Sequence, residues 1–266
     1  MTYSLYLIGS RARGDSHELS DVDYVCIHEG RKPTLHLPYS GNVSYYTPGR
    51  MMWMVKNSKL FVKHVLEDGI AINENSKHRA IISSFRIDAS ILTRDLLCFK
   101  SMLSCLGWIP PGDAGRMWAC DYIYAVSRNI LYISNALNGF YDFGYERALK
   151  FFFRNSDYCY LSDFLLIRDG KYRYRSNGSG VPEHCVASMA RVCQSLIGDP
   201  ISIAIGGKSS LIVEQRVSYE TLRLVERAVI NREVEDDGFV ARLKSHGEYF
   251  FLLRTAAKKI LLKLNR

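Results

Sequence analysis

Short apolar runs separated by polar turns fill the first third of the chain. The runs at residues 3–8, 21–27 and 42–47 are rich in β-branched and aromatic residues, which favour strands over helices. The pair Gly9-Ser10 ends the first run, and a polar stretch with turn-forming residues leads to the second. Three extended segments this close together predict a small sheet.

Helical spacing begins at Pro48. Apolar residues then recur three and four positions apart, with a break at Asn57-Ser58, until Asp68-Gly69 ends the pattern. A short strand over residues 70–72 follows. We therefore expect an α+β head with a small mixed sheet at residues 1–75.

Beyond residue 76 the pattern becomes helical. Long amphipathic stretches predict helices at residues 81–106, 117–137, 145–153, 181–197, 219–232 and 249–264. The segment RDGKYRYRSNGSG at residues 168–180 is interpreted as a loop, or as a hairpin built around Asp169-Gly170. Residues 76–266 are therefore predicted to form a mainly helical C-terminal domain.

Composition favours a soluble globular protein. Hydrophobic residues make up 47% and charged residues 23% of the 266 positions. No stretch approaches the roughly 18 apolar residues of a membrane span, and the N-terminus has no basic leader. The seven cysteines include no C-x-x-C pair, so neither a zinc site nor a disulfide framework is indicated. We expect a cytoplasmic protein with reduced thiols and no membrane partner.

The net charge of +8 makes a polyanionic partner plausible. Residues 239–266 contain seven Lys or Arg and one acid, Glu248, so this basic segment is a candidate contact for a nucleic-acid acceptor. The alternative is the solvated face of a surface helix. The run KYRYR at residues 171–175 could stack bases and pair phosphates, or it could simply alternate along an exposed hairpin.

Asp21 and Asp23 carry the most specific chemistry of the sequence. Residues two apart on a strand point to the same face, so the two carboxylates are expected to project together. Carboxylates this close repel each other unless a cation lies between them, and oxygen ligands suit Mg²⁺ or Mn²⁺. The Gly9-Ser10 turn offers backbone N–H groups and a hydroxyl to a phosphate chain, and the helix expected after it adds a positive dipole end. This layout suits phosphoryl or nucleotidyl transfer.

The same stretch resembles the polymerase β-type nucleotidyltransferases, in particular the minimal nucleotidyltransferases of prokaryotes. Their signature is an apolar strand, Gly-Ser, about ten variable residues and Asp-x-Asp on a second strand. Here Gly9-Ser10 precedes Asp21-Val22-Asp23 within SRARGDSHELSDVDYV. The segment YYTPGRMMWMVKNSKLFVKHVLEDGIAI resembles the strand, helix and His-x-x-(Glu/Asp)-Gly portion of many such domains, so the likeness covers about the first 75 residues.

The family carries a third acid on the strand after Asp-x-Asp, often four residues before Tyr-Thr-Pro. Counting back from Tyr46-Thr47-Pro48, that place belongs to Asn42, whose amide oxygen is a poorer ligand for a hard cation. Three explanations stay open. Another acid could serve, with Glu29, Glu67 and Asp68 the nearest. The substrate could complete the coordination. The protein could bind nucleotide without turnover.

The resemblance implies two groups of site residues, one for the metal and one for the nucleotide. Asp21 and Asp23 are the expected catalytic residues and, with Asn42, the expected metal ligands. Nucleotide binding is expected from Gly9, Ser10, Arg11 and Arg13, although either arginine could be a solvated loop residue. For His64, which lies among apolar residues, a core or capping role is favoured over catalysis.

The implied reaction is metal-dependent transfer of a nucleoside monophosphate from an NTP or dNTP to a hydroxyl. We favour the template-independent synthesis or extension of an oligonucleotide. The alternatives are nucleotidylation of a partner protein or a small molecule, and a non-catalytic nucleotide sensor. Relatives often act beside a toxin or an effector, so the resemblance also implies such a partner in antiviral defence or in a toxin–antitoxin pair.

Overall fold

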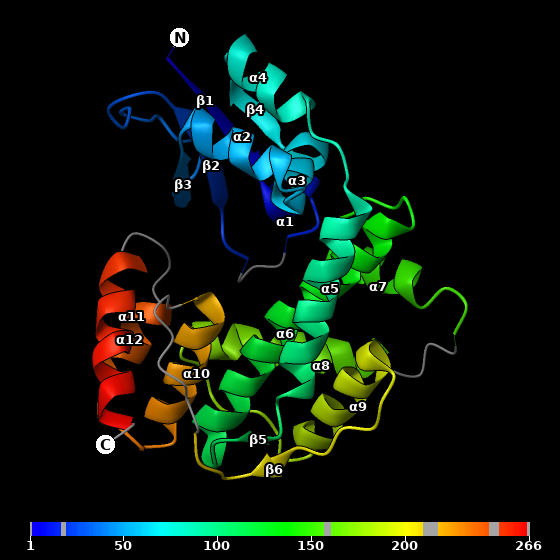
Figure 1. Ribbon diagram of the computed structural model, residues 1–266, viewed down its shortest axis with the longest axis vertical. Coiled ribbons are helices and arrows are strands. Elements are labelled where there is room, and N and C mark those ends of the chain that lie inside the picture. The colour runs from blue at the N-terminus through cyan, green and yellow to red at the C-terminus, as the bar shows by residue number, and fades with distance from the viewer. Residues whose placement is uncertain (1, 17–19, 157–160, 210–217, 245–249, 265–266) are drawn as a thin grey trace. The chain divides into compact units, whose positions relative to one another are not determined.

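The computed structural model describes residues 2–16, 20–156, 161–209, 218–244 and 250–264. The chain forms two compact units (Figure 1), and each is described by itself. The first unit comprises residues 1–99 and 128–157, and the second comprises residues 100–127 and 158–266. Two helices, α5 (Ala89–Ser104) and α6 (Gly112–Leu137), contribute residues to both units. The boundary at residue 75 stays a prediction about domain organisation.

A four-stranded mixed sheet is the centre of the first unit. Its strands are β1 (Tyr3–Ile8), β2 (Asp23–His28), β3 (Asn42–Tyr46) and β4 (Ile70–Asn73). The order is β3-β2-β1-β4, with β1 antiparallel to both β2 and β4 and with β2 parallel to β3. The four predicted strands are present, with β2 beginning two residues later than expected, and the C-terminal end of β1 and the N-terminal ends of β2 and β3 lie at the same edge of the sheet.

Alternation along β1 and β2 gives the sheet two buried faces, because a period of two sends neighbouring side chains to opposite sides. One face packs against α2, α3 and α4 and includes Tyr6, Ile8, Val25 and Ile27. The other face includes Leu5, Leu7, Tyr24 and Cys26, and it is covered by side chains from α1 and from the segment before β3. These central strands are therefore buried on both sides.

The helices of the first unit begin and end close to turn-forming residues of the sequence. They are α1 (Gly9–Arg13), α2 (Pro48–Lys56), α3 (Leu60–Asp68), α4 (Ser76–Ser83) and α7 (Tyr145–Phe152). Thr47 caps α2, since its Oγ1 accepts a hydrogen bond from the Arg50 N–H at 3.2 Å. Ser58, with φ of 46°, separates α2 from α3. The predicted break at Asn57-Ser58 is thus confirmed.

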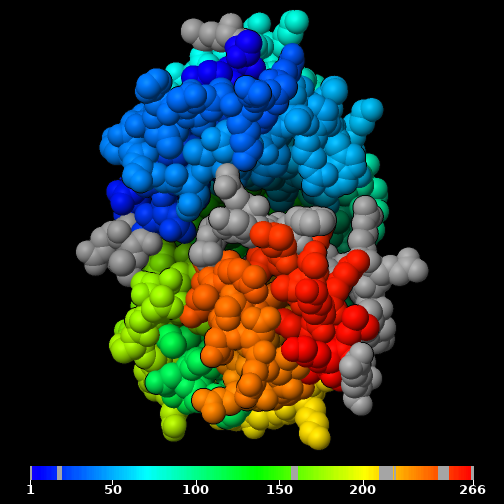
Figure 2. Space-filling model, turned by 90° about the vertical axis from the view of Figure 1, so that its left-hand side faces the viewer, coloured from blue at the N-terminus to red at the C-terminus, as the bar shows by residue number. Residues whose placement is uncertain are grey.

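The second unit is mainly helical. Besides parts of α5 and α6 it contains α8 (Leu161–Arg175), α9 (Cys185–Ile197), α10 (Tyr219–Ile230), α11 (Asp237–Lys244) and α12 (Phe250–Leu264). Two short strands, β5 (Trp108–Ile109) and β6 (Ala204–Ile205), pair in parallel. Helices α10, α11 and α12 share one apolar core cluster and form a continuous part of the surface in Figure 2. The predicted fold class, an α+β head followed by mainly helical structure, is confirmed.

A buried ion network organises this unit. The guanidinium of Arg223, which is 1% exposed, lies 2.8 Å from Asp121 Oδ2 and 2.9 Å from Glu226 Oε2. Glu226 also accepts hydrogen bonds from Trp118 Nε1 at 3.1 Å and from the Tyr174 hydroxyl at 2.5 Å. The buried charges are thus matched by partners on α6, α8 and α10.

Two predictions of local structure were wrong. Within the predicted loop or hairpin at residues 168–180, residues 168–175 are the end of helix α8, whereas residues 176–180 do form a turn and loop after it. Gly170 serves helix packing, because a β-carbon there would lie 2.4 Å from Cys120 Sγ. The expected helix at residues 81–106 is split between α4 and α5. Asp88 starts the second of these helices by accepting hydrogen bonds from the N–H groups of Ser90 and Ile91.

The remaining sequence-level expectations concern thiols and membranes. Six cysteines are free thiols, and four of them are buried: Cys26, Cys120, Cys185 and Cys193. Cys159 lies outside the described residues. Within the described part of the chain, no helix combines the length and the apolarity that crossing a membrane requires.

Candidate functional site

Three strand ends bring the sequence-predicted residues to one edge of the sheet. Ile8, the last residue of β1, lies opposite Asp23, the first residue of β2. Asp23 is in turn paired with Asn42, the first residue of β3. Neighbouring strands lie about 4.8 Å apart, and paired residues share a face of the sheet. The side chains of Asp23 and Asn42 therefore start side by side.

Asp21 lies outside the strand on which it was expected. The strand β2 begins at Asp23, so the two-residue spacing within a strand does not apply to the pair. The reason is that β1 ends at Ile8, and the chain turns away at Gly9 with φ of +77°, which leaves no β1 backbone opposite Asp21. Asp21 is exposed just before the strand.

Gly41 allows the close approach of β3 to β2. A β-carbon at Gly41 would lie 2.4 Å from the carbonyl oxygen of Val22 and 2.7 Å from its Cβ. The next residue, Asn42, donates its N–H to that same Val22 oxygen at 2.8 Å. Only glycine fits here without moving the strands. Sequence reasoning missed this residue, although a glycine directly before a strand signals such a contact.

Gly9 brings the Gly9-Ser10 turn, which was expected to contact a phosphate chain, next to Asp23. Its left-handed φ of +77° is a conformation that favours glycine. A β-carbon at Gly9 would lie 3.8 Å from Asp23 Oδ2, so the carboxylate is a direct neighbour of the turn. Ser10 follows as the second residue of α1. This helix has five residues, so the dipole expected after the turn is that of little more than one helical turn.

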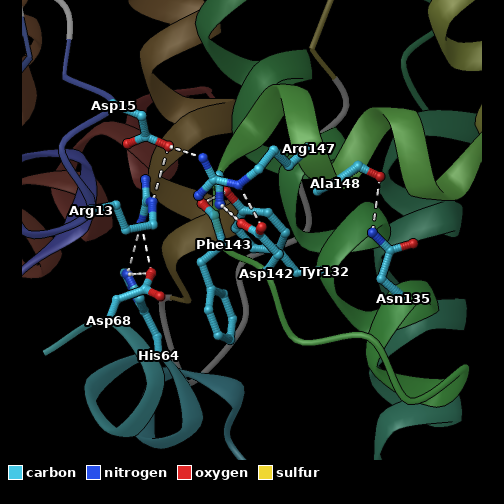
Figure 3. A network of polar contacts seen from close by, with 11 residues as sticks. Arg13, Asp15, His64, Asp68, Tyr132, Asn135, Asp142, Phe143, Arg147 and Ala148 are labelled. Carbon is cyan, nitrogen blue, oxygen red and sulfur yellow. Dashed lines mark hydrogen bonds and ion pairs between the residues drawn. The ribbon is translucent and has the colours of Figure 1, made fainter.

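Arg13 fixes α1 to α3 (Figure 3). Its Nη1 lies 2.8 Å from Asp68 Oδ2, and its Nε lies 3.2 Å from Asp15 Oδ2. The side chains of Arg13 and Asp68 are 12% and 10% exposed, so this pair is largely shielded from solvent. The arginine that was expected to contact phosphate therefore also anchors the helix that carries Gly9 and Ser10.

The environment of Asp68 stabilises its charged form. Burial alone would raise the pKa of this carboxyl, but hydrogen bonds with His64 and Arg13 outweigh burial and hold the pKa below its usual value. His64 Nε2 lies 3.2 Å from Asp68 Oδ2, and its ring stacks on Phe143 with centroids 4.7 Å apart. His64 is thus part of a packed structural network, in line with the role favoured from the sequence.

Arg147 extends this network to α7 (Figure 3). It lies 3.3 Å from Asp15 Oδ2 and 2.5 Å from Asp142 Oδ2. Asp142 also accepts the N–H of Gly144 at 2.7 Å. Asp15 therefore receives both Arg13 and Arg147, and the end of α1 is held from two sides. Sequence reasoning did not find this network, because its members are up to 134 positions apart.

The acids considered as substitutes for a third carboxylate lie elsewhere. Glu29 follows the far end of β2, six residues or roughly 20 Å along the strand from Asp23. Glu67 pairs with Lys63 on the surface of α3. Asp68 is engaged by Arg13 and His64. The residue beside Asp23 in the sheet is Asn42.

The donors available at this edge are oxygens. Asp21 and Asp23 offer carboxylates, Asn42 offers an amide oxygen, and Ser10 offers a hydroxyl. Hard oxygen donors of this kind suit Mg²⁺ or Mn²⁺. Among the described residues, no group of three or more His, Cys, Asp or Glu side chains is close enough to hold a metal ion. Arg11 is exposed on α1, next to the turn.

The run KYRYR does not form the exposed base-stacking hairpin that was considered. Tyr174 is 1% exposed and bonds to Glu226, and Arg175 makes two hydrogen bonds to Asp121 at 2.8 and 2.9 Å. Both residues support the core of the second unit. In the basic segment, Arg254, Lys258, Lys259 and Lys263 are exposed on α12, whereas Glu248 and Arg266 lie outside the described residues.

Comparison with known proteins agrees with the geometry of the sheet. Residues 2–90, about a third of the chain, match the family model described as a nucleotidyltransferase domain. No curated protein matches the chain. The matched region contains β1 to β4, the Gly9-Ser10 turn and the residues Asp21, Asp23 and Asn42. Residues 2–90 of this chain therefore match a nucleotidyltransferase domain, and this match fits the polymerase β-type superfamily that the Gly-Ser and Asp-x-Asp motif resembles.

Proposed function

We propose that the protein transfers a nucleoside monophosphate from an NTP or dNTP to a hydroxyl group of an oligonucleotide, without a template. The acceptor oxygen attacks the α-phosphorus, the bond to the bridging α,β-oxygen breaks, pyrophosphate leaves and the hydroxyl proton passes to solvent. The observation that carries the proposal is the alignment of Ile8, Asp23 and Asn42 across three strands, with Gly9 directly against the Asp23 carboxylate.

Asp21 and Asp23 are the proposed ligands for a divalent cation. Asp23 is held by the strand, while Asp21 precedes it on an exposed segment that can meet a ligand. When bound, Mg²⁺ or Mn²⁺ neutralises charge on the triphosphate and on the departing pyrophosphate. Asn42 adds a neutral oxygen at the position next to Asp23, so it holds a cation less strongly than a carboxylate would.

Gly9, Ser10, Arg11 and Arg13 are the proposed nucleotide-binding residues. The absence of a side chain at Gly9 lets a phosphate approach the backbone, and Ser10 offers its hydroxyl and N–H. Arg11 is exposed on the same turn of helix. Arg13 already bonds to Asp15 and Asp68, so its proposed contribution includes keeping α1 in place.

The choice of an oligonucleotide acceptor is supported by charge. The four exposed cations of α12 lie on a helix at the surface of the second unit (Figure 2), and a basic helix face suits a phosphate backbone. Since KYRYR is part of helix α8 and its residues Tyr174 and Arg175 bond to Glu226 and Asp121, this segment no longer supports the choice. The proposal therefore places the acceptor contacts on α12.

Incubation with labelled NTPs and dNTPs tests the acceptor. We expect a ladder of extended oligonucleotides on a denaturing gel, and its loss in Lys258→Glu/Lys259→Glu. Label on a polypeptide or on a small hydroxylated compound, with no ladder, would show a different acceptor class. The matched control is Lys56→Glu/Lys77→Glu, which reverses two charges on the first unit.

A nucleotide sensor without turnover is the second candidate, and Asn42 is the observation that favours it. Without a third carboxylate, deprotonating the acceptor becomes the difficult step. The two functions differ in pyrophosphate release. The sensor binds Mg²⁺-NTP with an affinity that depends on Asp21 and Asp23, yet releases no pyrophosphate with any acceptor.

The proposed setting is bacterial defence or a toxin–antitoxin pair, with an effector or toxin as the partner protein. This part of the proposal is supported by the superfamily alone. Sequencing the genes beside the one for this chain tests it. A neighbouring toxin or effector gene in several genomes supports the setting, and a neighbourhood of ordinary metabolic enzymes contradicts it.

A further inference from the structure

The second unit contains a cavity of about 550 Å³, which is within the usual range for small-molecule sites. Helices α6, α8, α10 and α11 and the turns after α8 and α10 line it. Val229, Ile230 and Val240 give it an apolar wall. Its charged lining residues are three cations, Arg175, Arg232 and Lys244, and one acid, Asp237. The cavity thus combines an apolar wall with an excess of positive charge.

Arg175 is held in a fixed orientation at this cavity. Its Nε and Nη2 donate to the two carboxylate oxygens of Asp121 at 2.9 and 2.8 Å, while its Nη1 lies 3.4 Å from the carbonyl oxygen of Lys244. Asp121 also receives Arg223 at 2.8 Å, so one carboxylate serves two guanidinium groups. Glu226, the other acid of this network, lies 2.9 Å from the guanidinium of Arg223. Arg175 is therefore a fixed group of the cavity wall whose charge is matched by Asp121.

Lys244 adds a second cation to the same wall. Its Nζ lies 4.0 Å from the centre of the Tyr174 ring and 3.3 Å from Asn177 Oδ1. Burial, reinforced by the charges of Arg175 and Arg223, lowers the pKa of Lys244. An anion in the cavity would favour the protonated form and reverse this shift.

Arg232 occupies a backbone position that favours glycine. Its φ is +56°, and it follows α10 as the left-handed residue of a Schellman turn. The turn is defined by two hydrogen bonds, from Arg232 N–H to the Val229 oxygen at 2.9 Å and from Glu233 N–H to the Ala228 oxygen at 3.0 Å. A long cation in this strained place, on the cavity lining, points to a role in binding more than in stability.

Asn177 has the same left-handed backbone conformation in the turn that follows α8. Its φ is +54°, and the next residue, Gly178, donates its N–H to the Arg173 oxygen at 2.8 Å. Asn177 lines the cavity and carries an amide that can donate hydrogen bonds. The three left-handed residues other than glycine in the described chain are Ser58, Asn177 and Arg232, and two of them line this cavity.

We propose that this cavity binds a phosphate monoester of nucleotide size. Arg175 is paired with Asp121, so Arg232 and Lys244 supply the positive excess over Asp237, and this excess suits the charge of about −2 on such a phosphate near neutral pH. Arg232, Lys244 and Asn177 contact the phosphate, and Val229, Ile230 and Val240 contact the organic part. The site is separate from the Asp21 and Asp23 residues of the proposed function and does not depend on it. The alternative is that the cations only balance the partial negative charge at the ends of α8 and α10.

Binding of AMP, adenosine and inorganic phosphate by calorimetry tests the site. The full chain carries Asp21→Ala/Asp23→Ala, and a chelator is present, so that the proposed metal-nucleotide site does not contribute. We expect AMP to bind at least tenfold more tightly than either adenosine or inorganic phosphate. Equal affinity for AMP and adenosine, or no binding of AMP at millimolar concentration, would overturn the proposal.

The variant Arg232→Gly distinguishes a role of the Arg232 side chain in binding from a role in folding. Glycine relieves the left-handed backbone, so this variant should melt at the same temperature as the parent or higher, while its affinity for AMP falls at least tenfold. The control is Arg242→Gln, which removes a cation of α11 that is not part of the cavity lining. Unchanged AMP affinity in Arg232→Gly, or the same loss in Arg242→Gln, would overturn the assignment of the cavity.

Discussion

Asp23 and Asn42 are paired residues at the first position of two parallel strands, β2 and β3. Their side chains share one face, and Gly9, the first residue after β1, lies against the Asp23 carboxylate. A carboxylate at position 42 would add a negative charge beside Asp23, at the position proposed as a further ligand for the cation. Because the chain has a neutral amide there, this pair of residues limits how strongly the proposed site holds a cation.

Asn42→Asp should raise the rate of pyrophosphate release by about tenfold or more, which corresponds to about 1.4 kcal/mol of transition-state stabilisation. The new carboxylate would complete the oxygen ligands beside Asp23. Ser44→Asp is the matched control, because Ser44 is exposed on the same strand and face but roughly 6.6 Å further along. If both substitutions have the same effect, position 42 has no special role.

Gly41→Ala should destabilise the protein by about 1–3 kcal/mol, since its methyl group would meet Val22 and push β3 away from β2. Urea denaturation measures the loss, and Mg²⁺-dependent NTP binding should weaken in parallel. At Gly49 in α2 a β-carbon meets nothing within 4 Å, so Gly49→Ala should be neutral or slightly stabilising. Equal effects of the two substitutions would argue against a close approach at Gly41.

Asp68→Asn should lower the stability at pH 7 by about 1–3 kcal/mol, because the charged hydrogen bonds with Arg13 and His64 are lost. The pKa of Asp68 is lowered in the folded state, so its contribution is present above the unfolded value of about 3.9 and disappears as the pH falls through the folded pKa. The difference between parent and variant should therefore shrink below about pH 4.

Denaturation of Asp68→Asn at a series of pH values checks this window. The control is Glu67→Gln, which removes a surface partner of Lys63 on the same helix and should change stability by less than about 0.5 kcal/mol. A difference between parent and Asp68→Asn that stays constant down to pH 2 would contradict the assigned pKa direction.

Arg223→Met should destabilise the second unit by about 3–5 kcal/mol, since it leaves the buried carboxylates of Asp121 and Glu226 with fewer cations. Thermal and urea unfolding measure this loss. The control is Arg173→Met, which changes an exposed arginine on α8 and should have an effect of about 0.5 kcal/mol or less. A similar small effect at Arg223 would mean that the network is energetically neutral.

Much of the first unit could be predicted from local pattern. The β-branched and aromatic content of residues 3–8 predicted the strand, and Pro48 predicted the start of α2, which Thr47 caps. The start of β2 could not be predicted in this way. It depends on where β1 leaves the sheet, and Gly9 sets that point through a backbone angle that the sequence pattern does not specify.

Side chains whose partners are far away in the sequence were the least predictable. The run KYRYR alternates like a hairpin, yet Arg175 bonds to Asp121, which lies 54 positions earlier, and this pairing holds the segment as a helix. Arg13 and Asp68 are 55 positions apart, so the anchoring role of Arg13 could not be inferred from the residues around it. Such roles follow from tertiary contacts, which outweigh local propensity.

Nucleotide binding by isothermal calorimetry, with and without Mg²⁺, tests the central claim most directly. The parent chain should bind an NTP or dNTP in the presence of Mg²⁺, and the affinity should fall at least about a hundredfold (about 2.7 kcal/mol) in Asp21→Asn/Asp23→Asn with no loss of thermal stability. Asp169→Asn/Asp199→Asn, which removes two exposed acids of the second unit, should bind as the parent does. Undiminished Mg²⁺-dependent binding in Asp21→Asn/Asp23→Asn would contradict the account.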